Sequence, residues 1–181
     1  MKSLAEQMYV YASYHRDGRN KGFHFLGVPM LTFAILIPMA AARLPVGGFE
    51  VSLAMAFVAA VLVYYFVLDV PLAAAMVLFI VPVTWAAHLV VDLGLWTWVA
   101  VFTAVFVVGW IVQLVGHVFE GRKPALVDNL FQVLVAPIFL MAESFFALGA
   151  KKRLHDEVEE MIRVRGLAGL ERRANAGPET A

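Results

Sequence analysis

The chain has 181 residues, of which 62% are hydrophobic and 15% are charged, and its mean hydropathy is +0.80. Soluble domains contain about 45–50% apolar and about 25% charged residues, so this composition excludes an ordinary soluble domain and indicates one integral membrane domain. The net charge is zero and cysteine is absent, which gives no reason to expect a nucleic-acid partner and excludes disulfides and thiolate metal ligands.

Four segments of the chain satisfy the requirement for a membrane-spanning helix, which is about 20 mostly apolar residues. They are residues 25–42, 51–68, 72–91 and 95–115. The first 14 residues lack the apolar core of a cleavable signal peptide, so we expect the first span to be the targeting element. Gly47 and Gly48 form a turn after the first span, and Pro82 lies inside the third, where membrane helices tolerate it.

A fifth segment, residues 126–148, contains more polar groups than a lipid-facing helix accepts, among them Asp128, Gln132 and Glu143. We therefore predict that it faces the bundle interior or is a re-entrant or interfacial element. The fold class is an all-α integral membrane protein, a bundle of four to five transmembrane helices. We expect residues 1–149 to be membrane-embedded and residues 150–181 to be a charged cytoplasmic tail, helical at first and then disordered.

Basic residues flank the first and the last apolar segments and indicate the orientation of the chain. They are Lys2, Arg16, Arg19, Lys21, Lys151, Lys152 and Arg153. Basic residues favour the cytoplasmic side, so both termini are expected there. Five full crossings would separate them, which favours four spans plus a re-entrant fifth segment. The alanine-rich tail is typical of a bacterial protein, so we expect a multi-pass protein of the inner membrane, or of the endoplasmic reticulum in a eukaryote.

Three histidines reach the same membrane face in this topology. His15 and His24 precede the first span, and His117 follows the fourth. His15 and His24 are nine residues apart, about two and a half turns of a straight helix, which would place them on opposite faces. They can converge only if the helix breaks, and Gly18 and Gly22 predict such a break.

The end of the fourth span carries a polar stripe. Trp110, Gln113 and His117 follow an i, i+3, i+7 spacing, so they share one helix face, and Glu120 continues it. Glu120 could accept the free ring N–H of a metal-ligating histidine. Gly116 leaves room for another backbone or a ligand beside His117.

Two further histidines differ from these three. His88 lies near the far end of the third span, so it could join them only if that span is kinked or tilted at Pro82, or if the site lies deep in the membrane. His155, in the charged tail, is expected to be a surface residue.

Imidazole ligands suit iron, zinc, copper and nickel, and a facial set with open positions suits non-haem iron(II). Common catalytic motifs such as HExxH, the desaturase histidine box, GxSxG and the Walker loop are absent from the sequence. The residues alone therefore indicate a membrane protein with a histidine-ligated metal. They leave open a non-catalytic lipid-binding or scaffold protein and a bis-histidine haem protein.

Several polar side chains near these histidines have more than one interpretation. Asp128 could cap the fifth helix or support the site. The cations anchor the topology or attract an anionic lipid head group. These cations are Arg16, Arg19, Lys21, Arg122 and Lys123.

Two polar blocks carry a resemblance to a known family. They are YHRDGRNKGFHFLGVP, residues 14–29, and GWIVQLVGHVFEGRKPALVDNLFQVLVAPIFLMAE, residues 109–143. Together they resemble the signature segments of the 2-hydroxy fatty acid dioxygenases, a family that includes an endoplasmic-reticulum enzyme of 2-hydroxypalmitate α-oxidation. The resemblance extends from the N-terminus to about residue 148.

The resemblance implies an Fe(II)-dependent dioxygenase that α-oxidises 2-hydroxy fatty acids with dioxygen, giving fatty acids one carbon shorter. Residues 1–149 would be the catalytic domain. His15, His24 and His117 would be catalytic and bind the iron, with His88 as a suspected further ligand. The acyl tail would lie between the spans in the lipid bilayer, and the oligomeric state stays open.

The resemblance also implies roles for the remaining polar residues. Gln113, Glu120 and Asp128 would support the metal ligands. The basic residues would balance the substrate carboxylate, and they are Arg16, Arg19, Lys21, Arg122 and Lys123.

Overall fold

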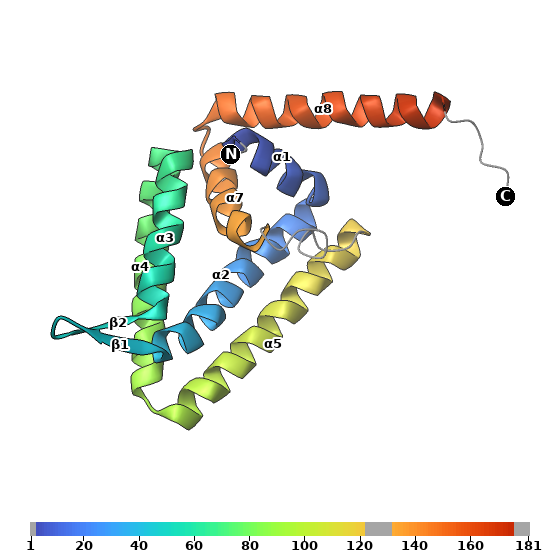
Figure 1. Ribbon diagram of the computed structural model, residues 1–181. Coiled ribbons are helices and arrows are strands. Elements are labelled where there is room, and N and C mark those ends of the chain that lie inside the picture. Colours follow the sequence, from blue (N-terminus) through green and yellow to red (C-terminus); the bar gives the residue numbers. More distant parts are fainter. Residues whose placement is uncertain (1–2, 122–131, 176–181) are drawn as a thin grey trace.

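The computed structural model describes residues 3–121 and 132–175, which form seven helices and one β-hairpin (Figure 1). The elements are α1 (Leu4–Tyr14), α2 (Gly18–Ala41), β1 (Arg43–Val46), β2 (Phe49–Ser52), α3 (Leu53–Leu68), α4 (Val70–Asp92), α5 (Leu95–Glu120), α7 (Gln132–Ala147) and α8 (Lys152–Asn175). This architecture confirms the all-α class and the membrane bundle expected from the sequence.

The helical structure is interrupted between α1 and α2. This is the break that His15 and His24 need in order to face each other. α1 begins at a capping box, in which Ser3 Oγ accepts from the Glu6 N–H and Glu6 Oε2 accepts from the Ser3 N–H. A new helix starts at Gly18 because Asp17 Oδ1 accepts from the Arg19 N–H at 2.8 Å. The predicted break therefore lies at residues 15–17, and Gly22 is inside α2.

Three helices of the described chain, α2, α4 and α5, are long and apolar enough to cross a bilayer. α3 has 16 residues, about 24 Å of helix, and is shorter than the usual span. α7 and α8 are bent by 113° relative to each other, so this pair is a broken span or a re-entrant element. The polar fifth segment corresponds to α7, and residues 126–131 lie outside the described residues.

The connection between α2 and α3 is an antiparallel β-hairpin where the sequence predicted only a turn. Gly47 and Gly48 both have positive φ, as a tight hairpin turn requires. The base of the hairpin is tied to the end of α4 by the ion pair between Arg43 and Asp92 at 2.6 Å.

α2 packs along α5 through small residues (Figure 1). A Cβ added at Gly109 would lie 3.0 Å from Leu31 Cδ2. A Cβ added at Gly116 would lie 2.6 Å from Asn20 Oδ1 and 3.0 Å from Phe23 Cβ. Small residues of this kind let two membrane helices approach closely, so glycines set the distance between the helices that carry His24 and His117.

α1 and α8 lie together at the same end of the bundle (Figure 1). Val158 of α8 is buried in the core, and the Arg165 guanidinium lies 4.6 Å from the centre of the Tyr9 ring. The tail expected to be helical is a helix over Lys152–Asn175, and it packs against α1. Residues 176–181, expected to be disordered, are outside the described residues. The cytoplasmic location of the two ends stays a prediction.

Replacing Gly116 with alanine is expected to lower the free energy of unfolding by about 1–3 kcal/mol, because the new methyl group overpacks the α2–α5 contact. Gly22→Ala is the matched control, since a Cβ there meets no atom within 4 Å. It is expected to be neutral or to stabilise the helix by up to about 1 kcal/mol. Unfolding of both variants in detergent micelles checks this, and equal stabilities would contradict the close approach at Gly116.

Candidate metal centre

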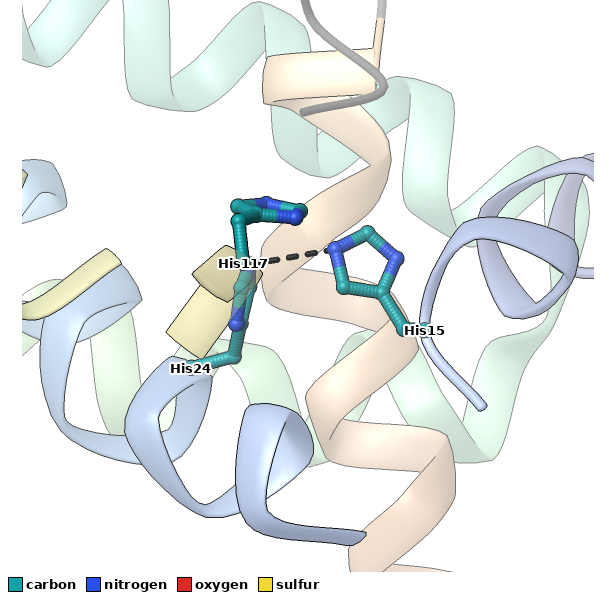
Figure 2. A group of neighbouring side chains, drawn as sticks. All are labelled: His15, His24 and His117. Atoms are coloured by element: carbon teal, nitrogen blue, oxygen red, sulfur yellow. Dashed lines mark hydrogen bonds between the residues drawn. The ribbon is translucent and has the colours of Figure 1, made fainter. Parts of the chain in front are cut away.

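Three histidines from separate elements meet at one point (Figure 2). His15 follows α1, His24 lies in the second turn of α2, and His117 lies in the last turn of α5. Their ring centroids are 4.4 to 5.2 Å apart, and one nitrogen from each ring lies within 4.8 Å of the others. All three are buried. Within residues 3–121 and 132–175, this is the one group of three potential ligands so close together.

Backbone contacts fix the tautomers of two of these rings. His15 Nδ1 is 2.7 Å from the Tyr11 carbonyl, and His24 Nδ1 is 2.9 Å from the Asn20 carbonyl. A carbonyl oxygen only accepts, so each Nδ1 carries the proton and donates it. The Nε2 atoms of His15 and His24 then carry lone pairs, and they face each other at 3.1 Å.

Two lone pairs at this distance repel unless a proton or a metal cation lies between them. A proton is disfavoured, because burial lowers the pKa of His15 to about 4 even though the hydrogen bond to the Tyr11 carbonyl acts in the opposite direction. A metal ion fits: two nitrogens each about 2.1 Å from one ion lie about 3 Å apart when their bonds meet at right angles.

The third ring completes the donor set. His117 Nδ1 is buried and has no hydrogen-bond partner among the described residues. A buried nitrogen left without a partner is costly, and a metal ion would satisfy it. Calcium and magnesium take oxygen ligands, whereas imidazole suits iron, zinc, copper and nickel. The residues present therefore fit a transition metal held by three histidines.

Glu120 holds the turn that carries the first two histidines. Its Oε1 accepts from the Arg16 N–H and its Oε2 from the Asp17 N–H, both at 2.9 Å. The same Oε2 accepts from Asn20 Nδ2 at 3.0 Å. The sequence suggested that Glu120 would accept an imidazole N–H, and this is corrected: the ring N–H groups of His15 and His24 go to backbone carbonyls, and the carboxylate binds the turn.

A largely apolar cavity with about 680 Å³ of empty space, including its open mouth, lies beside the three histidines. Trp110, Gln113 and His117 all line it, which confirms the stripe expected on α5. Gln132 lines it from α7. Gln113 and Gln132 are 8% and 6% exposed, and the Oε1 atom of each has no hydrogen-bond partner in the described parts of the chain. Two buried acceptors are therefore available to a ligand in this cavity.

A second cavity, with about 550 Å³ of empty space, adjoins the first. The two share Thr32, Ile35 and Val133 in their walls. The second cavity extends away from the histidines toward α3 and α4, and its walls are almost entirely apolar.

His88 does not join the three histidines, which corrects the suggestion that it is a ligand. Its Nδ1 donates to the Thr84 carbonyl at 2.8 Å, and its Nε2 accepts from the Ser52 hydroxyl at 2.9 Å. Ser52 ends the hairpin that follows α2, at the opposite end of that helix from His24. Pro82 lies inside α4, and His88 stays at the end of this helix that is far from the three histidines. His155 is exposed and lies against the Phe146 ring, as expected for a surface residue.

The described basic residues of the first block already have carboxylate partners. Arg19 pairs with Asp17 at 2.8 Å, and Lys21 pairs with Glu143 at 2.8 Å. Arg16 reaches Glu159 of α8 at 3.4 Å. None of these three cations is among the described residues that line the first cavity.

A role for any of these basic residues at the substrate carboxylate therefore stays a prediction. Three of the residues expected at the site fall outside the described part of the chain. They are Arg122, Lys123 and Asp128.

Two positions of the site were not assigned from the sequence. Asn20 is fully buried, and it links His24 to Glu120 through its carbonyl and its amide. Gln132 was recognised only as a polar residue in an apolar segment. A buried amide in a membrane helix is itself a signal of function, because such groups are costly in hydrocarbon.

The sequence model of the family described as 2-hydroxy-palmitic acid dioxygenase Mpo1-like matches residues 1–148, which end just after α7. The 2-hydroxy-palmitic acid dioxygenase MPO1 of Saccharomyces cerevisiae is 34% identical over 168 residues, covering 90% of this chain and 91% of the yeast protein. No solved structure matches the chain. The chain belongs to the Mpo1-like family of 2-hydroxy-palmitic acid dioxygenases.

Proposed function

We propose that this protein is an Fe(II)-dependent dioxygenase that α-oxidises 2-hydroxy fatty acids to fatty acids one carbon shorter. The observation that carries the proposal is the group of three buried histidines, in which two unprotonated nitrogens face each other at 3.1 Å. The adjoining apolar cavity and membership of the family support the same function. The name of the yeast relative gives 2-hydroxypalmitic acid as the substrate of that protein.

His15, His24 and His117 would hold the iron. Three neutral imidazoles leave coordination positions open, and iron(II) bound there would supply the chemistry that activates dioxygen beside an α-hydroxy carboxylate. The reaction balances without an added reductant: one 2-hydroxy acid and one dioxygen give the shorter acid, carbon dioxide and water. The bond between the carboxyl carbon and the hydroxyl-bearing carbon breaks.

The chain's own groups prepare the site in three ways. The carbonyls of Tyr11 and Asn20 keep the ring protons on Nδ1, so the Nε2 lone pairs stay available. The Oε1 atoms of Gln113 and Gln132 can accept a hydrogen bond from the 2-hydroxyl group of the substrate, and their amide N–H groups can donate hydrogen bonds to its carboxylate. The apolar walls exclude water from the head of the substrate.

The proposed location is a membrane, since three helices can cross one and fatty acids partition into bilayers. The histidines lie near the N-terminal end of α2 and the C-terminal end of α5, which are at the same end of the bundle. The carboxylate end of the fatty acid would therefore react near the bilayer surface. We propose the bacterial inner membrane, with both termini in the cytoplasm.

Purified protein reconstituted with Fe(II) without oxygen is expected to bind about one iron per chain, and to convert 2-hydroxypalmitate to pentadecanoate once oxygen is admitted. Alanine at His15, His24 or His117 should remove most of the iron and at least 99% of the turnover, because each removes one of three ligands. Elemental analysis and mass spectrometry of the product measure the two effects.

His88→Ala and His155→Ala are the matched controls, because both histidines lie outside the cluster. They should keep the iron. Equal iron content in all five variants would exclude the histidine site, and iron without the shorter acid would contradict the proposed reaction. A Soret band in the purified protein would point to haem.

Glu120→Ala is expected to weaken iron affinity by about 10- to 100-fold, the usual effect of losing a group that orients metal ligands. Glu120→Gln should fall between alanine and wild type, because one amide oxygen can still accept an N–H. Competition with a chelator measures the affinity. Glu50→Ala, in the exposed hairpin, is the control. A loss of iron affinity in this variant as large as in Glu120→Ala would contradict a specific role for Glu120 in holding the turn that carries the histidines.

Gln113→Leu and Gln132→Leu are each expected to lower kcat/KM for 2-hydroxypalmitate by about tenfold, because each removes one hydrogen bond worth about 1.4 kcal/mol to the substrate head. The binding preference for 2-hydroxypalmitate over palmitate should fall with it, while the iron content is unchanged. Turnover assays and competition binding measure these quantities. A preserved preference in both variants would contradict head-group recognition by the glutamines.

A further inference from the structure

Two cavities in the bundle adjoin each other, with three wall residues in common. The first contains the three histidines and both unpartnered glutamine oxygens, and the second contains none of them among its described lining residues. Their shared wall residues lie on α2 and α7. An elongated ligand whose reactive end lies at the histidines would therefore enter the second cavity by passing Thr32, Ile35 and Val133.

The walls of the second cavity suit a hydrocarbon chain. Leu36 and Val61 are typical of the lining, which comes from α2, α3, α4 and α7. Tyr65 also contributes, but its hydroxyl donates to the Leu134 carbonyl and is already satisfied. A cavity with so few free polar groups would not hold a head group, and it gains free energy from each methylene that it buries.

The second cavity extends from α2 and α7 toward α3 and α4. α7 contacts both α2 and α4, and α2 also packs directly against α3 and α4. The first cavity is lined by α1, α2, α5 and α7, and the second crosses to α3 and α4. A tail that follows this path would be enclosed by protein over part of its length.

We propose that the second cavity is the subsite for the alkyl tail, and that its far wall sets the chain length of the acid. This inference rests on the proposed function, because that function supplies the occupant: a 2-hydroxy acid whose head is held at the histidines. The tail passes the shared residues Thr32, Ile35 and Val133 and ends among side chains of α3 and α4.

Bulky substitutions at two depths test the path. Val133→Phe narrows the junction of the two cavities, and Val61→Phe fills only the second. Val63→Phe is the matched control, because Val63 lies on the same helix as Val61 and is 64% exposed. Val61→Met is a smaller filling change that serves if the phenylalanine variant does not fold.

The ratio of kcat/KM for 2-hydroxypalmitate to that for 2-hydroxyoctanoate is expected to fall at least tenfold in Val61→Phe and to be unchanged in Val63→Phe. Each buried methylene contributes about fourfold to binding, so the loss of two or more gives this change. Val133→Phe should also impair 2-hydroxyoctanoate, because the obstruction is nearer the histidines. Identical chain-length profiles in Val61→Phe and Val63→Phe would overturn the inference and indicate that the cavity holds only membrane lipid.

Binding without oxygen separates this inference from the proposed function. Displacement of a fluorescent fatty acid by 2-hydroxypalmitate and 2-hydroxyoctanoate needs no turnover. If the protein has no oxygenase activity but Val61→Phe still weakens long-chain binding selectively, the tail subsite stands and the reaction is wrong. If turnover occurs and neither Val61→Phe nor Val133→Phe changes the chain-length profile of activity or of binding, the reaction stands and the subsite is wrong.

Discussion

The candidate metal centre depends on two unprotonated nitrogens, His15 Nε2 and His24 Nε2, which the fold holds 3.1 Å apart in a buried site. Left alone they repel each other, and the desolvated site resists the proton that would relieve the repulsion. The fold brings them together nonetheless. The break between α1 and α2 turns one ring toward the other, and the close packing of α2 on α5 brings in His117. A fold that holds donors in an unfavourable arrangement is prepared for the cation that makes it favourable.

Hydropathy was sufficient to predict the class of fold and most of the helices, because the bilayer sets both the length and the composition of a span. The break before α2 was also predictable, since Asp17 and Gly18 are local signals of a helix start. The hairpin was not, because its strands have only four residues each, too few for their pattern to be told apart from the ends of the neighbouring apolar segments. α3 proved shorter than expected, because Val51 and Ser52 belong to the hairpin.

The convergence of three histidines could be predicted from topology, but their partners could not. Glu120 had two chemically reasonable acceptor roles, and only the tertiary structure shows that it binds backbone N–H groups of the turn. His88 illustrates the opposite case. A proline in a helix permits a bend but does not specify one, and the Ser52 hydroxyl supplies a local reason for a histidine at that position.

The way in which Glu120 holds its turn has an evolutionary consequence. Its carboxylate accepts hydrogen bonds from the main-chain N–H groups of residues 16 and 17, and every residue except proline has such a group. These two hydrogen bonds therefore do not depend on which side chains occupy the two positions. A change of side chain at position 16 would therefore leave this contact in place, whereas Asp17 has a second role as the N-cap of α2. The constraint instead falls on the carboxylate itself and on Asn20, whose neighbour across the helix contact must stay as small as a glycine.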